Sequence, residues 1–167
     1  LLQSQKEILQ TVMALMRKKR DEESRDKGRS AQYTYLPSGG QLSWPVQGQI
    51  TSTFGSRVHP VFKTKMMHTG MDIRAPRGTP VRAAGPGEVL FAGWLRGYGQ
   101  VIIIDHGNNL SSVYAHLSTM SVRESSAVKK GQTIGAVGST GTATGAHLHF
   151  EVRVGGDARD PMRYLRK

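Results

Sequence analysis

The sequence predicts a mainly β fold, an antiparallel β-sheet domain with a short N-terminal helix. Three observations support this class. From Trp44 onward, short apolar runs alternate with glycine-rich turn signals. The intervals between these runs are too short for repeated strand–helix–strand crossovers, which favours antiparallel pairing. By contrast, residues 1–20 carry apolar side chains at helical spacing and contain neither glycine nor proline.

The strands of this domain are predicted from short apolar runs bounded by turn residues. The predicted strands are 80–84, 87–92, 100–105, 111–116, 133–137 and 147–154. The segments between them are rich in the residues that tight turns require, and these are 75–78 (APRG), 85–87 (GPG), 97–99 (GYG), 107–109 (GNN) and 138–145 (GSTGTATG).

The N-terminal helix carries a narrow apolar stripe. Leu2, Leu9 and Met16 recur every seven residues, and Ile8, Val12 and Leu15 flank them. The stripe spans about two heptads, fewer than a coiled coil usually needs. Two interpretations stay open: the end of a longer coiled coil, or a helix packed on its own domain. The coiled-coil end is slightly favoured, because the run continues into the charged stretch 17–29.

The length of 167 residues indicates one main domain with an appendage. We predict a helical segment over 1–30, a linker over 31–43 and the β domain over 44–167. The linker prediction rests on LPSGGQLS at 36–43, which is rich in Pro, Gly and Ser. The chain opens at Leu1 and not at methionine, so we expect a piece of a longer protein, with any signal or anchor in the missing part.

Composition narrows the function classes. The chain has no cysteine, which excludes disulfides and thiolate metal sites. It has no apolar run of eighteen residues, so no transmembrane helix is expected. The formal net charge is +11, with +3 in residues 1–30 and +8 in the rest. This charge fits polyanion binding or a plain solvated surface. A nucleic-acid-binding β domain is a rival, but 7% aromatic residues is low for base stacking and no nucleic-acid partner is expected.

The histidines are the most informative residues. His147 and His149 lie two apart in a predicted strand, so both face one side, about 6.6 Å apart along the backbone. Leu148 and Phe150 then point into a core. The histidine pair fits a shared metal, a metal ligand with a supporting neighbour, or two solvent-facing side chains.

A second pair is His68 and Asp72. Four residues of extended strand span about 13 Å, too far for two ligands of one ion. The chain must therefore curl between them, and Gly70 would allow it. The same pattern is also compatible with an ordinary turn that contains a polar histidine.

Three further histidines have less specific settings. Tyr114 and His116 are predicted to share a strand face, with His116 structural unless its neighbours indicate otherwise. His106 is predicted to be a turn residue, and His59 fits either a structural role or the lining of a cleft.

In combination these motifs resemble the lysostaphin-type (LytM-type) zinc metallopeptidases of bacterial cell walls, over about residues 44–164. The matching segments are FGSRVHP (54–60), HTGMDIRAPRGTPV (68–81), GYGQVIIIDHG (97–107), YAHLS (114–118), VKKGQTIGAVGSTGTATGAHLHFEV (128–152) and DPMRYL (160–165). Each is weak alone, and their order makes the resemblance specific.

The resemblance implies roles for five residues. His68, Asp72 and His149 would bind one Zn²⁺, and His116 and His147 would be the catalytic pair. Two histidines and a carboxylate leave a fourth position for water, the pattern of a catalytic zinc site. There is no H-E-x-x-H motif, so no glutamate base of that class is present.

The implied function is zinc-dependent hydrolysis of peptidoglycan cross-link or bridge peptides. The N-terminal helix favours a D,D-endopeptidase over a glycyl-glycine endopeptidase, since similar helical regions occur in envelope members of the family. It would also suit an envelope protein partner. The alternative is a non-catalytic activator of cell-wall amidases, a role of family members that have lost zinc ligands. The implied location is extracytoplasmic: periplasm, cell surface or secreted.

Overall fold

A computed structural model of the chain describes residues 2–24, 34–37, 39–58, 61, 65–141 and 145–166. It confirms the predicted class: a large antiparallel sheet with one helix near the N-terminus. The helix is α1 (Leu2–Ser24). The strands and the short 3₁₀ helix follow in the order β1 (Leu42–Ser43), β2 (Gln49–Ser52), β3 (Gly55–Val58), β4 (Lys65–His68), β5 (Met71–Arg74), β6 (Pro80–Arg82), β7 (Gly87–Leu95), β8 (Gly99–Gly107), β9 (Leu110–Met120), β10 (Ala127–Val128), β11 (Thr133–Val137), β12 (His147–Val154), β13 (Asp157–Arg159), η2 (Pro161–Arg163) and β14 (Leu165–Arg166).

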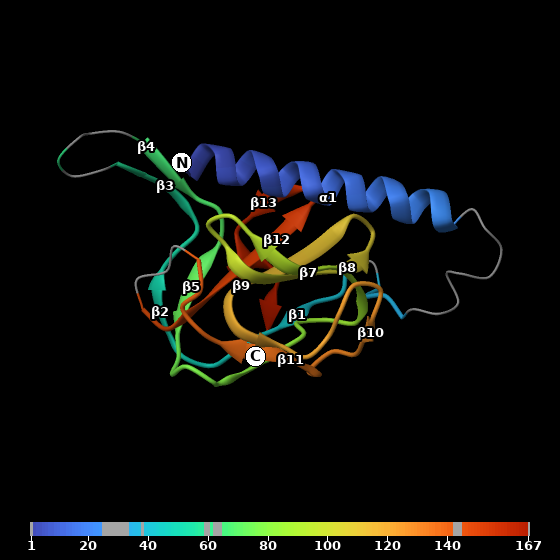
Figure 1. The fold of residues 1–167 in the computed structure, drawn as a ribbon. Coiled ribbons are helices and arrows are strands. Elements are labelled where there is room, and N and C mark those ends of the chain that lie inside the picture. The colour runs from blue at the N-terminus through green and yellow to red at the C-terminus, as the bar shows by residue number, and fades with distance from the viewer. Residues whose placement is uncertain are drawn as a thin grey trace.

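The main sheet has the strand order β10-β7-β8-β9-β12-β5-β2. Strand β11 joins it through β9 and β6, and β13 pairs with β12. Every pair in this sheet is antiparallel, as the short connections require. Two small sheets flank it: β1 pairs with β14 in parallel, and β3 pairs with β4 in antiparallel fashion. Figure 1 shows the strongly twisted sheet with α1 lying along one side.

The main core lies on one face of β12 and the site residues lie on the other. Leu148, Phe150 and Val152 are fully buried in the main core, as the alternation predicted for the first two. The residues between them, from His147 to Arg153 at every second position, therefore face the opposite side. Strand β12 therefore carries the main core on one face and a row of polar side chains on the other.

A second, smaller core joins α1 to the sheet of the same chain. Leu9 and Met13 of the helix are buried with Tyr98, in the turn between β7 and β8, and with Val101 and other apolar residues of β7, β8 and β9. The helix therefore packs on its own domain, one of the two interpretations that the sequence left open. A coiled coil with a partner stays a prediction. Nowhere in the described ranges is there a helix with the length and hydropathy to cross a membrane.

The described part of the predicted linker packs with the domain. Leu36 and Leu42 are buried in the main core, and Leu42 pairs with Leu165 across β1 and β14. The backbone N–H of Leu36 also donates to the carbonyl of His106, at 2.9 Å. The division of the chain at 30 and 43 into three units stays a prediction.

The packing of α1 predicts which helix substitutions reduce stability. Leu9 is fully buried, whereas Leu15 on the same helix is 61% exposed. Leu9→Ala should lower the free energy of unfolding by about 2–5 kcal/mol, because it leaves a cavity in the second core. Leu15→Ala should change it by less than about 0.5 kcal/mol. Urea denaturation of both variants measures this, and equal effects would contradict the packing.

Candidate metal centre

The pairing of β12 with β5 sets the geometry of the site. His149 lies opposite Asp72, and His147 lies opposite Arg74. Directly opposed residues of an antiparallel pair point to the same face, with Cβ atoms about 4.5–5.5 Å apart. Both histidines and the carboxylate therefore face away from the main core, on neighbouring strands.

His68 reaches the same place from the end of β4. The chain bends at Thr69 and Gly70 before β5 begins at Met71, so the predicted curl between His68 and Asp72 is present. The reason for the glycine differs from the prediction. Gly70 is not among the glycines with a positive φ; instead, a Cβ atom here would collide with the backbone carbonyl oxygen of Phe150. Gly70 permits the close approach of this bend to β12.

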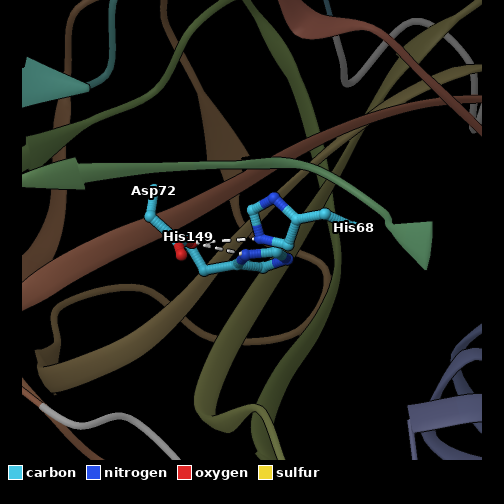
Figure 2. A group of neighbouring side chains, drawn as sticks. All are labelled: His68, Asp72 and His149. Atoms are coloured by element: carbon cyan, nitrogen blue, oxygen red, sulfur yellow. Dashed lines mark hydrogen bonds and ion pairs between the residues drawn. The ribbon is translucent and has the colours of Figure 1, made fainter. Parts of the chain in front are cut away.

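His68, Asp72 and His149 form a group with metal-ligand spacing (Figure 2). One ligand atom from each lies within 4.8 Å of the other two. The Asp72 Oδ1 atom is 2.9 Å from His149 Nδ1 and 3.5 Å from His68 Nε2. Donor atoms on one tetrahedral zinc ion lie roughly 3.3 Å apart, as bonds of about 2.0–2.1 Å require. The spacing thus suits one small cation, and the donor set is free of sulfur.

The other ring nitrogen of each of these histidines is already engaged. His68 Nδ1 lies 2.8 Å from the carbonyl oxygen of Thr53, so Nδ1–H donates there and Nε2 is the nitrogen on the Asp72 side. His149 Nε2 lies 2.7 Å from Glu151 Oε2, which leaves Nδ1 on the Asp72 side. The nitrogens on the Asp72 side, Nε2 of His68 and Nδ1 of His149, are therefore the ones that could bind a metal, and each must be unprotonated to do so.

His116 and His147 lie beside this group. Their ring centroids are 5.0 Å apart, and the His116 ring is 6.0 Å from that of His149. His147 Nε2 is 3.8 Å from Asp72 Oδ1. The Nδ1 atoms of both are held by backbone carbonyls, that of Thr140 at 2.6 Å for His116 and that of Gly145 at 2.9 Å for His147. The five residues to which the family resemblance assigns roles therefore lie together.

The prediction that His116 shares a strand face with Tyr114 is wrong. Tyr114 packs on Phe150 in the main core, with ring centroids 5.4 Å apart. The cause is an irregularity in β9: Gln100 pairs with Leu117 but Ile102 pairs with Tyr114, and His116 has a left-handed φ of 64°. Such a bulge breaks the two-residue alternation and re-aims one side chain. The bulge turns the His116 side chain to the face that carries the site, at a cost of roughly 1–3 kcal/mol in backbone strain.

The prediction that His106 is a turn residue is also wrong, and His106 lies outside the site. His106 belongs to β8, and the turn is made by Asn108 and Asn109, which both have positive φ. It is fully buried, with Nδ1 2.8 Å from the Pro86 carbonyl oxygen and Nε2 2.7 Å from Ser112 Oγ. Burial lowers its pKa to about 4. His59 lies outside the described residues.

Charge balance shapes the site. Burial alone would raise the pKa of Asp72, but hydrogen bonds with His149 and His68 hold it well below its usual range. Burial would lower the pKa of His149, yet Asp72 and Glu151 on its two sides raise it to about 9. Burial, together with the charge of His149, lowers the pKa of His116 to about 4, so its ring is neutral at pH 7.

Glu151 is the residue beside the site that sequence reasoning missed. It is fully buried, and its carboxylate also contacts Thr69, Tyr98 and Arg153. The signal was available: the alternation that aligned His147 with His149 extends through Glu151 to Arg153. A carboxylate two residues after a histidine ligand on one strand face lies within reach of its ring.

The sequence profile of Peptidase family M23 matches residues 66–161, which span the site residues. The chain belongs to this family. The resemblance to the lysostaphin-type peptidases is thereby confirmed.

Two curated relatives are similar to the chain over the β domain. The DD-carboxypeptidase/endopeptidase Mpg of Neisseria meningitidis is 47% identical over 117 residues, which are 70% of this chain and 27% of that protein. The murein hydrolase activator NlpD of Escherichia coli is 43% identical over 123 residues, which are 73% of this chain and 30% of that protein. The chain thus spans less than a third of the length of these relatives.

Solved structures share the fold. A zinc-containing peptidase from Vibrio cholerae has a TM-score of 0.70 and 35% identity, covering 76% of this chain and 42% of that one. The catalytic domain of lysostaphin from Staphylococcus simulans has a TM-score of 0.63 and 34% identity, covering 70% of this chain and 91% of that one.

The charge of His149 predicts a pH dependence of stability in the metal-free protein. Its pKa is about 9 in the fold against about 6.5 in an unfolded chain. A raised pKa stabilises the fold fully below pH 6.5, and this contribution is lost as the pH rises through about 9. The free energy of unfolding of the chelator-treated protein, measured by denaturation at pH 6.5 and 9.5, should therefore fall more for the parent than for His149→Gln between these two pH values. Equal losses in the two proteins would contradict the charge assigned to His149.

Proposed function

We propose that the chain is a zinc-dependent endopeptidase that hydrolyses peptide bonds of peptidoglycan. The observation that carries the proposal is the convergence of a complete donor group, His68, Asp72 and His149, with the histidine pair His116 and His147. Membership of a peptidase family supports it, as does the similarity to a zinc-containing peptidase.

The three donors suit zinc. Zinc takes histidine nitrogens and carboxylate oxygens in tetrahedral sites, and three protein ligands leave a fourth position for water or substrate. His68 would bind through Nε2 and His149 through Nδ1, because their other nitrogens are hydrogen-bonded. When bound, zinc lowers the pKa of a water ligand towards about 7 and polarises the scissile carbonyl.

The histidine pair would handle protons. Because Nδ1 of each ring donates to a backbone carbonyl, Nε2 is the nitrogen that takes up or releases a proton. We propose that one ring accepts the proton of the attacking water, and that the other stabilises the developing oxyanion or protonates the leaving amine. Burial keeps His116 neutral and so able to accept a proton at pH 7.

The similarity to a curated relative supports the proposed substrate class. Mpg is a DD-carboxypeptidase/endopeptidase, and its similarity to this chain supports D,D-endopeptidase activity over glycyl-glycine cleavage. The formal net charge of +11 suits an anionic cell wall. An extracytoplasmic location follows from the same proposal.

Zinc content and activity together should distinguish the proposed zinc ligands from the proposed proton-transfer histidines. A strong chelator should abolish hydrolysis and added zinc should restore it. His149→Ala should lose bound zinc, because two donors remain. His116→Ala should keep zinc while turnover falls by about 10²–10⁴-fold, the usual contribution of an acid–base residue. Zinc content per folded protein and muropeptide release measure these effects, with His106→Gln as a histidine control outside the site.

If His116→Ala hydrolysed peptidoglycan as well as the parent, the proton-transfer role given to His116 would be wrong. If His149→Ala kept a full complement of zinc, the ligand set would be wrong.

Digestion of purified peptidoglycans of different cross-link type tests which peptide bond the chain cleaves. We expect D,D-cross-linked dimers to be converted to monomers, with each cleavage adding one water to the product mass. Peptidoglycan bridged by glycines should stay intact. Cleavage confined to glycyl–glycine bonds would contradict the D,D assignment while leaving the zinc peptidase intact.

A second candidate function, activation of murein hydrolases, is supported by the similarity to NlpD. The two functions separate in one assay. Peptidoglycan that resists the chain alone, but is released when the chain is added to a cell-wall amidase, would favour the activator. Hydrolysis by the chain alone, lost on chelation, would favour the peptidase.

A further inference from the structure

Glu151 is a buried carboxylate in contact with the metal centre, and the five site residues do not account for it. Both it and Arg153 have no exposed surface. A buried charge is costly unless it is paired and hydrogen-bonded. This pair lies immediately behind the proposed ligand His149, on the same face of β12.

The carboxylate of Glu151 is saturated with donors. Its Oε2 atom accepts from Tyr98 Oη at 2.8 Å and from Thr69 Oγ1 at 2.7 Å, and it lies 2.7 Å from His149 Nε2. Its Oε1 atom accepts from Arg153 Nε at 2.7 Å. The carboxylate is thereby fixed in position, and the guanidinium of Arg153 pairs with it.

The donors link several parts of the site. Thr69 follows His68 directly in the chain, so Glu151 connects the segments that carry two proposed ligands. The ring of Tyr98 lies edge-on to that of His149, with centroids 5.7 Å apart. The backbone carbonyl of Tyr98 accepts from the N–H of His116 at 2.9 Å. Tyr98 also belongs to the second core, which anchors it on the side of α1.

We propose that Glu151 is a positioning residue of the metal centre: its carboxylate holds His149 with Nε2 protonated and Nδ1 directed to the metal, and strengthens zinc binding through that ring. The inference rests on the proposed zinc-binding function. Its chemical basis is general, because a carboxylate that accepts from the far nitrogen of a histidine ligand fixes its tautomer, its orientation and its basicity.

A purely structural role for Glu151 is the competing explanation. Arg153 Nη1 donates to the carbonyl of Gly156 at 2.8 Å, so the ion pair also supports the turn between β12 and β13. A structural role would lower stability without changing the zinc affinity of the protein that remains folded. Zinc affinity and the state of the His149 ring are therefore the decisive measurements.

The test is the zinc dissociation constant of the whole chain, measured by competition with a chelator. Glu151→Gln keeps the shape and an acceptor oxygen but removes the charge. We expect it to weaken zinc binding by about 10–100-fold, the usual effect of losing such a partner. In the zinc-loaded parent, NMR should show a slowly exchanging proton on His149 Nε2, and in the variant this proton should exchange faster.

Glu151→Gln leaves Arg153 buried without its carboxylate, so a second route avoids dependence on that variant. The double change Glu151→Gln with Arg153→Met removes both charges and should show the same loss of affinity. A matched pair of milder changes is Tyr98→Phe and Tyr114→Phe. Each removes one buried, hydrogen-bonded hydroxyl, but only Tyr98 contacts Glu151. Only Tyr98→Phe should weaken zinc binding, by several-fold.

Parent-like zinc affinity in folded Glu151→Gln, or in the double variant if the single one does not fold, would overturn the positioning role. So would equal affinities for Tyr98→Phe and Tyr114→Phe. Absence of zinc binding by the parent would instead refute the proposed function, so the two failures are distinguishable.

Discussion

The register between β12 and β5 is the constraint on which the rest of the site depends. It sets His149 against Asp72 and leaves Leu148, Ile73 and Phe150 in the main core. Because side chains alternate with a period of two, a slip of one residue would send the histidines into the core and the apolar residues to the site. The hydrophobic core therefore enforces the metal-ligand geometry, and the two cannot be varied independently.

The charges of the site follow from this arrangement. Asp72 and Glu151 lie on opposite sides of the His149 ring, and Arg153 balances Glu151. Without a metal, the ring holds a proton between two carboxylates, as its raised pKa of about 9 indicates. A divalent cation at Asp72 would replace that proton. Loading with metal and deprotonation of His149 are thus the same event, since a histidine ligand must be unprotonated at the coordinating nitrogen.

Part of this site could be predicted from the sequence. Period-two alternation placed His147 and His149 on one strand face, and the strand pattern indicated the antiparallel class. The full set of His68, Asp72, His116, His147 and His149 was implied by the family resemblance that the ordered motifs carry. The failures have non-local causes. The bulge at His116 depends on how β9 pairs with β8, and the role of Gly70 depends on the approach of β12.

The helix is a similar case. Its apolar stripe fits either a second helix of a coiled coil or the β domain of the same chain. Only the three-dimensional arrangement shows that Leu9 and Met13 are buried against β7, β8 and β9. Glu151 was missed for a different reason. Alternation aligns Glu151 with His147 and His149, but which ring nitrogen its carboxylate contacts is set by packing.

A crystal structure of the zinc-loaded protein, with anomalous data collected at the zinc edge, tests the proposed ligand set directly. We expect one ion bound by His68 Nε2, Asp72 Oδ1 and His149 Nδ1, with His116 and His147 close by but not coordinating. An ion bound by His116 or His147 in place of His149, or a His149 ring coordinating through Nε2, would contradict it.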